Sequence, residues 1–225
     1  MKRTTSISGE IGQLLIIGFD GTEMSPRLHS LLTGLQPAGV ILFARNIAGG
    51  EQTHRLLNEC QSCVPVRLFT CVDMEGGRVD RFRKVTGPSP SAADVFATGT
   101  RQLYRKHGKI IGDACRALGF NTDFAPVVDL AFEASRNVMR SRAVSADPKE
   151  ATAYAREFLI GLRSAGVLGR SNISPASERR ISIHIMNSRV LISLGRSCGT
   201  PTSPPTVLCA ANHPWSWSAM PHIRR

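Results

Sequence analysis

Five charged side chains gather in one short segment, residues 73–81, around a pair of glycines. They are Asp73, Glu75, Arg78, Asp80 and Arg81. A carboxylate can accept hydrogen bonds from vicinal sugar hydroxyls, and an arginine can donate to hydroxyl or carboxylate oxygens with fixed geometry. Gly76 and Gly77 let the chain turn sharply and approach a ligand closely. The same residues also fit an internal ion-pair network at the rim of a sheet, and their pattern alone leaves both interpretations open.

Alternating strands and helices are predicted to position this segment. We expect strands at 14–19, 39–43, 68–72 and 121–130, and helices at 25–35, 52–63, within 94–118 and at 148–162. This alternation is typical of a parallel sheet covered by helices. Residues 73–81 directly follow the third strand. They therefore lie at the carboxyl ends of the strands, where α/β barrels hold their catalytic residues.

The composition excludes some kinds of partner. A net charge of +11 would ordinarily suggest nucleic acid, but seven arginines lie in residues 170–225, where Glu178 is the single acid. Before Gly169 the acids and bases are interspersed, so we predict no nucleic-acid partner. No apolar run approaches the ~20 residues of a membrane helix, and residues 14–17 are too few for a signal sequence. We therefore expect a cytoplasmic protein without a membrane partner.

Cysteine and histidine give no convincing metal site. Cys60 and Cys63 are the only close cysteine pair and have no second pair to complete a ligand set, so we expect a structural role for both. His29, His54 and His107 all fall on predicted helices, where a solvated or partly packed histidine is the better interpretation. No metal or cofactor is predicted.

Four motifs carry a resemblance to a known family. The segment Val-Asp-Met-Glu-Gly-Gly-Arg-Val-Asp-Arg-Phe at 72–82 is the most specific. The others are Gly-Val-Ile-Leu-Phe-Ala-Arg-Asn at 39–46, Asn-Thr-Asp-Phe-Ala-Pro-Val-Val-Asp at 121–129, and Ser-Arg-Ala at 141–143 before Asp-Pro at 147–148. In this order, over residues 10 to 169, they resemble glycoside hydrolase family 3 of the β-N-acetylhexosaminidase type.

The resemblance implies a fold and an activity. It implies an α/β fold of the (β/α)8 TIM-barrel type, of which residues 1–169 carry about the first four βα units. It also implies a cytoplasmic, cofactor-free enzyme that removes terminal β-linked N-acetylglucosamine, in bacteria often from muropeptide fragments during cell-wall recycling.

The resemblance also assigns roles to three residues in this chain. Asp73 corresponds to the carboxylate that grips sugar hydroxyls, and Arg81 and Arg142 correspond to the substrate-binding arginines. Four further residues match less informatively. For Asp123 and Asp129 hydrogen bonding at the strand end is at least as good an interpretation, and Arg45 and Asn46 are expected to order the loop after the second strand.

The tail, residues 170–225, departs from this pattern. It is basic, rich in Ser, Pro and Arg, and has no sustained period, so we expect an irregular, disordered extension. The family continues at this point with Lys-His-Phe-Pro-Gly, then an Asp-Ser-His whose histidine is the general acid/base, and later an aspartate nucleophile. None of these appears in the tail, so no catalytic residue is assigned and we predict that the chain is inactive.

A shifted reading frame explains the departure. If the last base of each codon is joined to the first two of the next, synonymous codons for 171–188 can encode Lys-His-Phe-Pro-Gly-Leu-Gly-Glu-Ala-Asp-Ile-Asp-Ser-His-His-Glu-Leu-Pro. Residues 214–223 can likewise give Met-Val-Met-Val-Ser-His-Ala-Ala-Tyr-Pro. We therefore hypothesise a frameshift near Gly169 or Arg170, which sequencing of the encoding DNA tests directly.

Three alternatives remain at this stage. Another family 3 β-glycosidase shares the motifs but cleaves a different sugar. A non-catalytic sugar-binding remnant would bind N-acetylglucosamine saturably and lose that binding in Asp73→Ala. A basic nucleic-acid-binding protein would need aromatic and basic residues on one ordered face of the tail, and the sequence does not show this arrangement.

Overall fold

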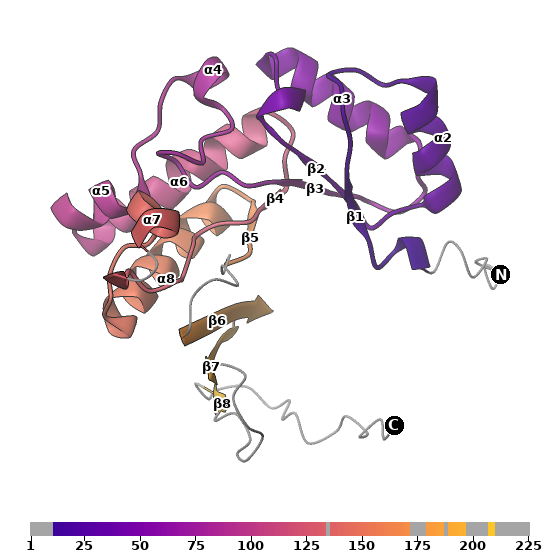
Figure 1. The fold of residues 1–225 in the computed structure, drawn as a ribbon. Coiled ribbons are helices and arrows are strands. Elements are labelled where there is room, and N and C mark those ends of the chain that lie inside the picture. Colours follow the sequence, from indigo (N-terminus) through magenta and orange to yellow (C-terminus); the bar gives the residue numbers. More distant parts are fainter. Residues whose placement is uncertain (1–10, 134–135, 172–178, 187–188, 197–206, 210–225) are drawn as a thin grey trace, which may run out of the picture.

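The computed structural model describes residues 11–133, 136–171, 179–186, 189–196 and 207–209, the last three ranges as backbone only. Its main feature is a parallel sheet with the strand order β1-β2-β3-β4-β5 (Figure 1). The strands are β1 (Ile16–Gly18), β2 (Gly39–Leu42), β3 (Phe69–Val72), β4 (Thr122–Asp123) and β5 (Leu168–Gly169). Sequential parallel order with helical crossovers confirms the α/β prediction.

Two of the longer helices begin at a cap followed by a proline. The longer helices are α2 (Pro26–Leu35), α3 (Gly50–Ser62), α5 (Ala92–Thr98), α6 (Arg101–Ala117) and α8 (Pro148–Ser164). Ser25 accepts a hydrogen bond from the Leu28 amide at the start of α2. Asp147 accepts one from the Lys149 amide at the start of α8. A proline follows each of these caps, where its missing N–H costs nothing.

Three differences from the predicted elements have physical causes. The helix expected within 94–118 is preceded by a separate helix, α5, because the backbone becomes extended at Gly99. A side chain would not fit at this break, since a Cβ on Gly99 would lie 2.2 Å from the Val95 carbonyl oxygen. The fourth strand ends well before residue 130, and Pro126, which follows, has no N–H for a strand ladder. The fifth strand was not predicted, because two residues carry no periodic signal; it pairs with β4.

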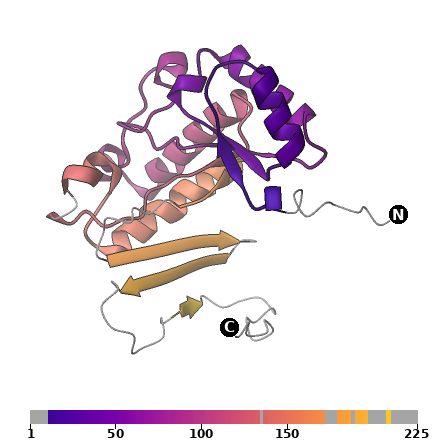
Figure 2. The ribbon, with the colours of Figure 1, turned by 45° about the vertical axis from the view of Figure 1, so that its right-hand side comes forward.

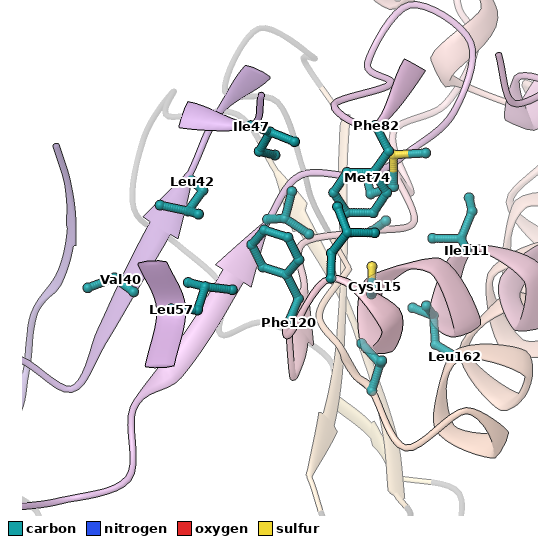
Figure 3. Packing of buried hydrophobic residues seen from close by; sticks show 14 of the residues in the cluster. Val40, Leu42, Ile47, Leu57, Met74, Phe82, Ile111, Cys115, Phe120 and Leu162 are labelled. Carbon is teal, nitrogen blue, oxygen red and sulfur yellow. The ribbon is translucent and has the colours of Figure 1, made fainter. Parts of the chain in front are cut away.

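The main core lies between one face of the sheet and the helices. Val40, Leu42 and Val72 point to this face and are fully buried. Figure 3 shows Val40 and Leu42 beside Leu57 of α3, and Ile111, Cys115 and Leu162 of α6 and α8 farther along the same cluster. Burial raises the pKa of the Cys60 thiol to about 12 and that of Cys71 to about 12, as expected for structural cysteines.

The opposite face of the sheet is partly open. The register pairs Ile16 with Gly39 and Gly39 with Phe69, and it pairs Cys71 with Thr122 and Thr122 with Leu168. Since side chains alternate along a strand, these residues share one face. Ile16, Phe69 and Leu168 are 38%, 45% and 51% exposed. Cys71 and Thr122 on the same face are buried, so among the described residues the open part of this face lies around Ile16, Phe69 and Leu168.

The tail contains three described backbone segments, β6 (Arg179–Met186), β7 (Arg189–Arg196) and β8 (Val207–Cys209). They pair antiparallel in a sheet of their own, and Figure 2 shows β6 and β7 running in opposite directions. Isoleucine alternates with Ser182 and His184 in β6, a strand signal that the expectation of an irregular tail passed over. The remaining tail residues lie outside the described residues, so the separate, out-of-frame tail stays a prediction. Where the structure is described, no helix has the length and apolar character needed to cross a membrane.

Candidate functional site

The candidate site lies at the carboxyl end of β3, where the chain leaves the sheet in a tight loop. Gly76 and Gly77 have φ of +82° and +57°, a conformation that a Cβ disfavours. Two buried side chains, Met74 and Phe82, hold the two ends of this loop in the core. Met74 is 1% exposed, and Phe82 is fully buried and stacked on Phe120 at 5.5 Å between ring centroids (Figure 3). The polar residues between these anchors are thereby held at the rim.

Asp73 and Arg81 form the first ion pair at this rim. The Arg81 Nη2 lies 3.6 Å from the Asp73 Oδ2, and both side chains are mostly buried. Burial raises the pKa of the Asp73 carboxyl above its ordinary value, while the charges of Arg81 and Arg142 act in the opposite direction. Asp73 is therefore a partly desolvated acceptor beside two cations, which suits a hydroxyl-rich ligand.

Glu75 and Arg142 form the second pair, across 67 residues of sequence. The Arg142 Nε and Nη2 donate to the two Glu75 carboxylate oxygens, each at 2.8 Å. Glu75 is buried and the Arg142 side chain is 24% exposed. The hydrogen bond to Glu75 raises the pKa of the Arg142 guanidinium. The fork–fork geometry fixes Arg142, which comes from the short helix η3 (Arg140–Arg142).

The structure thus brings together the three residues singled out from the sequence. Asp73 and Arg81 are in direct contact, and the Arg142 guanidinium acts electrostatically on Asp73. The alternative of an ion-pair network is also visible, since both arginines are paired with carboxylates. Sugar binding by Asp73, Arg81 and Arg142 remains a prediction. The role of Glu75 in holding Arg142 was missed, because a pairing over such a separation leaves no local signal.

Two other carboxylates have structural positions. The fully buried Asp123 accepts a hydrogen bond from the Met74 amide at 2.8 Å, which confirms the interpretation of strand-end bonding. Burial raises the pKa of the Asp123 carboxyl well above its ordinary value. Asp129 is also buried, and its charge helps to raise the pKa of Arg142. Both residues support the site from behind rather than forming its rim.

The loop after β2 is ordered by Asn46, as predicted. Its side chain donates to the carbonyls of Phe19 at 3.0 Å and Gly21 at 2.8 Å, and accepts from the Phe43 amide at 2.9 Å. Arg45 pairs instead with the exposed Asp20 at 2.8 Å. Within the described residues, no group of three or more His, Cys, Asp or Glu side chains is arranged to hold a metal ion.

His107 lies behind the glycine loop and makes folding sensitive to acid. It is 5% exposed, its Nδ1 lies 2.8 Å from the Tyr154 hydroxyl, and burial lowers its pKa to about 4. The unfolded chain, with a histidine pKa of about 6.5, binds a proton more readily. The contribution to stability is therefore complete above pH 6.5 and is lost as the pH falls toward 4.

We expect the free energy of unfolding to fall by about 2–3 kcal/mol between pH 7 and pH 4.5 through this one group. Urea denaturation at the two pH values measures the loss. His107→Gln should flatten the dependence, whereas His54→Gln, which changes an exposed histidine, should leave it as it is. An identical pH dependence in the wild type and His107→Gln would contradict the assignment.

Comparison with known proteins places the chain in a family. Residues 6–172 match the model of the glycosyl hydrolase family 3 N-terminal domain. The beta-hexosaminidase of Xanthomonas campestris pv. campestris strain B100 is 36% identical over 160 residues, which cover 68% of this chain and 48% of the relative. That of Stenotrophomonas maltophilia strain K279a is 34% identical, with 47% of the relative covered. The chain thus spans about half the length of these relatives.

Solved structures agree. A family 3 beta-N-acetylglucosaminidase from Paenibacillus sp. FPU-7 superposes with a TM-score of 0.71 at 29% identity, covering 75% of this chain and 33% of that one. The beta-N-acetylhexosaminidase of Beutenbergia cavernae DSM 12333 gives a TM-score of 0.67 at 25% identity, with 77% and 54% covered. The family model takes in well over half of the chain, and the chain therefore belongs to glycosyl hydrolase family 3, whose N-terminal domain it carries in residues 6–172.

Proposed function

We propose that Asp73, Arg81 and Arg142 form the sugar-binding side of a site for terminal β-linked N-acetylglucosamine. One observation carries the proposal: Asp73, Arg81 and Arg142 converge at the carboxyl end of β3, with Asp73 desolvated between two cations. A family 3 relative named as a beta-N-acetylglucosaminidase supports this choice of sugar. The proposed setting is the cytoplasm, with cell-wall muropeptide fragments as the saccharides and a closed TIM barrel as the complete fold.

We further propose that the chain as translated does not hydrolyse the sugar that it binds. A retaining glycosidase needs an acid/base and a nucleophile on either side of the glycosidic bond. In the family that the chain resembles, both follow the fourth βα unit, and their motifs are absent from residues 170–225 as read. Binding without turnover is therefore the proposed property of this chain.

Binding of N-acetylglucosamine to the purified chain tests the first proposal, measured by saturation-transfer NMR titration. A hydrogen bond to a charged group contributes about 1.5–3 kcal/mol, so Asp73→Asn should weaken binding roughly 10-fold or more. Arg78→Ala is the matched control, because Arg78 lies in the same loop but its side chain is exposed. Saturable binding that Asp73→Asn leaves unchanged, or no binding by the wild type, would contradict the proposal.

A further inference from the structure

Phe43 lies at the same end of the sheet as Asp73, although no role beyond its strand was predicted for it. Leu42 pairs with Val72 in the register of β2 and β3, so the next residues, Phe43 and Asp73, are neighbours on one face of the sheet. This is the face that turns away from the helices. A Cβ on Gly18 would lie 3.3 Å from Phe43 Cε2, so the ring lies against the end of β1.

The backbone of Phe43 is held tightly. Its amide donates to the Asn46 side chain at 2.9 Å, and its carbonyl accepts from the Asn46 amide at 2.8 Å. Asn46 is itself fully buried and bonded to the preceding loop. Because the backbone is clamped from both sides, the position of the ring is set before any ligand arrives, which is the condition for a preorganised site.

The ring contacts the cation of the site. The Arg81 Cζ lies 5.7 Å from the Phe43 centroid, within the range of a cation–π interaction. Other restraints on this guanidinium are weak. Its nearest approach to Asp73 is 3.6 Å, beyond hydrogen-bond distance, and its buried Nε has no hydrogen-bond partner among the described residues. The aromatic face is therefore a second restraint on Arg81, in addition to the charge of Asp73.

We propose that Phe43 is a positioning residue for the Arg81–Asp73 pair and that its ring forms the apolar platform on which the C–H face of a bound sugar packs. This inference rests on the proposed sugar site, and it adds a specificity element to it. Hexopyranose rings present hydroxyls at their edge and C–H groups on their faces. A carboxylate and an arginine can bind the hydroxyls while an aromatic ring beside them packs against the C–H face.

The positioning role has a readout that needs no sugar. In Phe43→Leu, which keeps an apolar side chain but removes the π face, Arg81 should move away from Asp73. The pKa of Asp73, followed by carboxyl ¹³C NMR, should then rise by about half a unit to one unit. Phe43→Tyr should leave it unchanged. Arg45→Ala is the matched control, because the Arg45 Cζ lies 4.9 Å from the same ring but its carboxylate partner is Asp20.

The platform role is measured by N-acetylglucosamine titration of the same variants. Phe43→Leu should weaken binding about 3- to 10-fold, with wild-type affinity in Phe43→Tyr. An unchanged Asp73 pKa in Phe43→Leu overturns the positioning role, whether or not the wild type binds sugar. If Phe43→Leu does not fold, the positioning role can still be tested in the wild type by proton NMR. Contact with the Phe43 ring requires an upfield shift of the Arg81 guanidinium protons, and the absence of that shift would overturn the role. Sugar binding that is present and equal in all variants overturns the platform.

Discussion

Replacing Glu75 with alanine is expected to lower the free energy of unfolding by about 3 kcal/mol, because it leaves Arg142 mostly buried without its counter-ion. The Glu75 side chain is 4% exposed and accepts both hydrogen bonds of the pair at 2.8 Å. Arg142→Ala should lower the free energy of unfolding by a similar amount, since it leaves the buried Glu75 carboxylate without its partner. Urea denaturation at pH 7 measures both changes.

A double variant without either charge separates the ion pair from its surroundings. Glu75→Gln combined with Arg142→Met should recover part of the loss, because neither side chain then carries a buried charge. Asp20→Ala provides the matched control. It removes an Arg45–carboxylate contact of the same 2.8 Å length, but there the two side chains are 55% and 89% exposed. An exposed pair contributes about 0–1 kcal/mol, so equal losses in Glu75→Ala and Asp20→Ala would contradict the account of Glu75.

The pair also has a consequence for binding. Glu75 accepts hydrogen bonds from the Nε and Nη2 of Arg142, and these bonds leave the Nη1 group outside the pair. Arg142 comes from η3 and Glu75 from the loop after β3, so their contact fixes the segment before α8 against the site. In the proposed site, Glu75 would therefore be a positioning residue that holds Arg142.

Local signals predicted much of the fold. The helices predicted at 25–35 and 148–162 both have a proline at their start, and the structure shows Ser25 and Asp147 as hydrogen-bonded caps there. The apolar runs predicted the first three strands to within two residues at each end. Such features depend on neighbours along the chain, and the sequence displays those neighbours directly.

Long-range features were not readable in this way. Glu75 and Arg142 are 67 residues apart, and Phe43 meets Arg81 only because β2 and β3 pair in one particular register. The resemblance brought Arg142 into the predicted site, yet it gave neither the partner of Arg142 nor the ring beside Arg81. Contacts of this kind become visible only once the sheet has been assembled.

The open face of the sheet bears on the hypothesis of a shifted frame. Ile16, Phe69 and Leu168 are partly exposed on a surface that a closed barrel would cover. The chain covers 48% of the Xanthomonas relative. The residues that would close the barrel and those that would act on the sugar are expected from the same stretch of coding sequence.

We therefore expect an active enzyme when one base is inserted at the codons for Gly169 and Arg170. The gene must then be expressed together with the DNA that follows codon 225. The shifted reading supplies Lys-His-Phe-Pro-Gly directly after β5 and then Asp-Ser-His. General acid–base catalysis alone contributes about 10²–10⁴-fold, so hydrolysis of a chromogenic N-acetylglucosaminide should rise at least about 100-fold over the chain as it stands. The unshifted chain should show no turnover above background.

Two controls separate restored catalysis from restored folding. In the shifted chain, alanine in place of the Asp-Ser-His histidine should abolish most turnover without reducing the melting temperature, since that residue lies on a loop. Asp73→Asn in the same background should raise KM or lower kcat/KM, because it weakens binding of the sugar and leaves the acid/base in place. Turnover by the unshifted chain would contradict the proposed inactivity. Codons in 171–188 that cannot encode the family motifs would rule out the frameshift, and an inactive but folded shifted chain would show that restoring the frame does not restore catalysis.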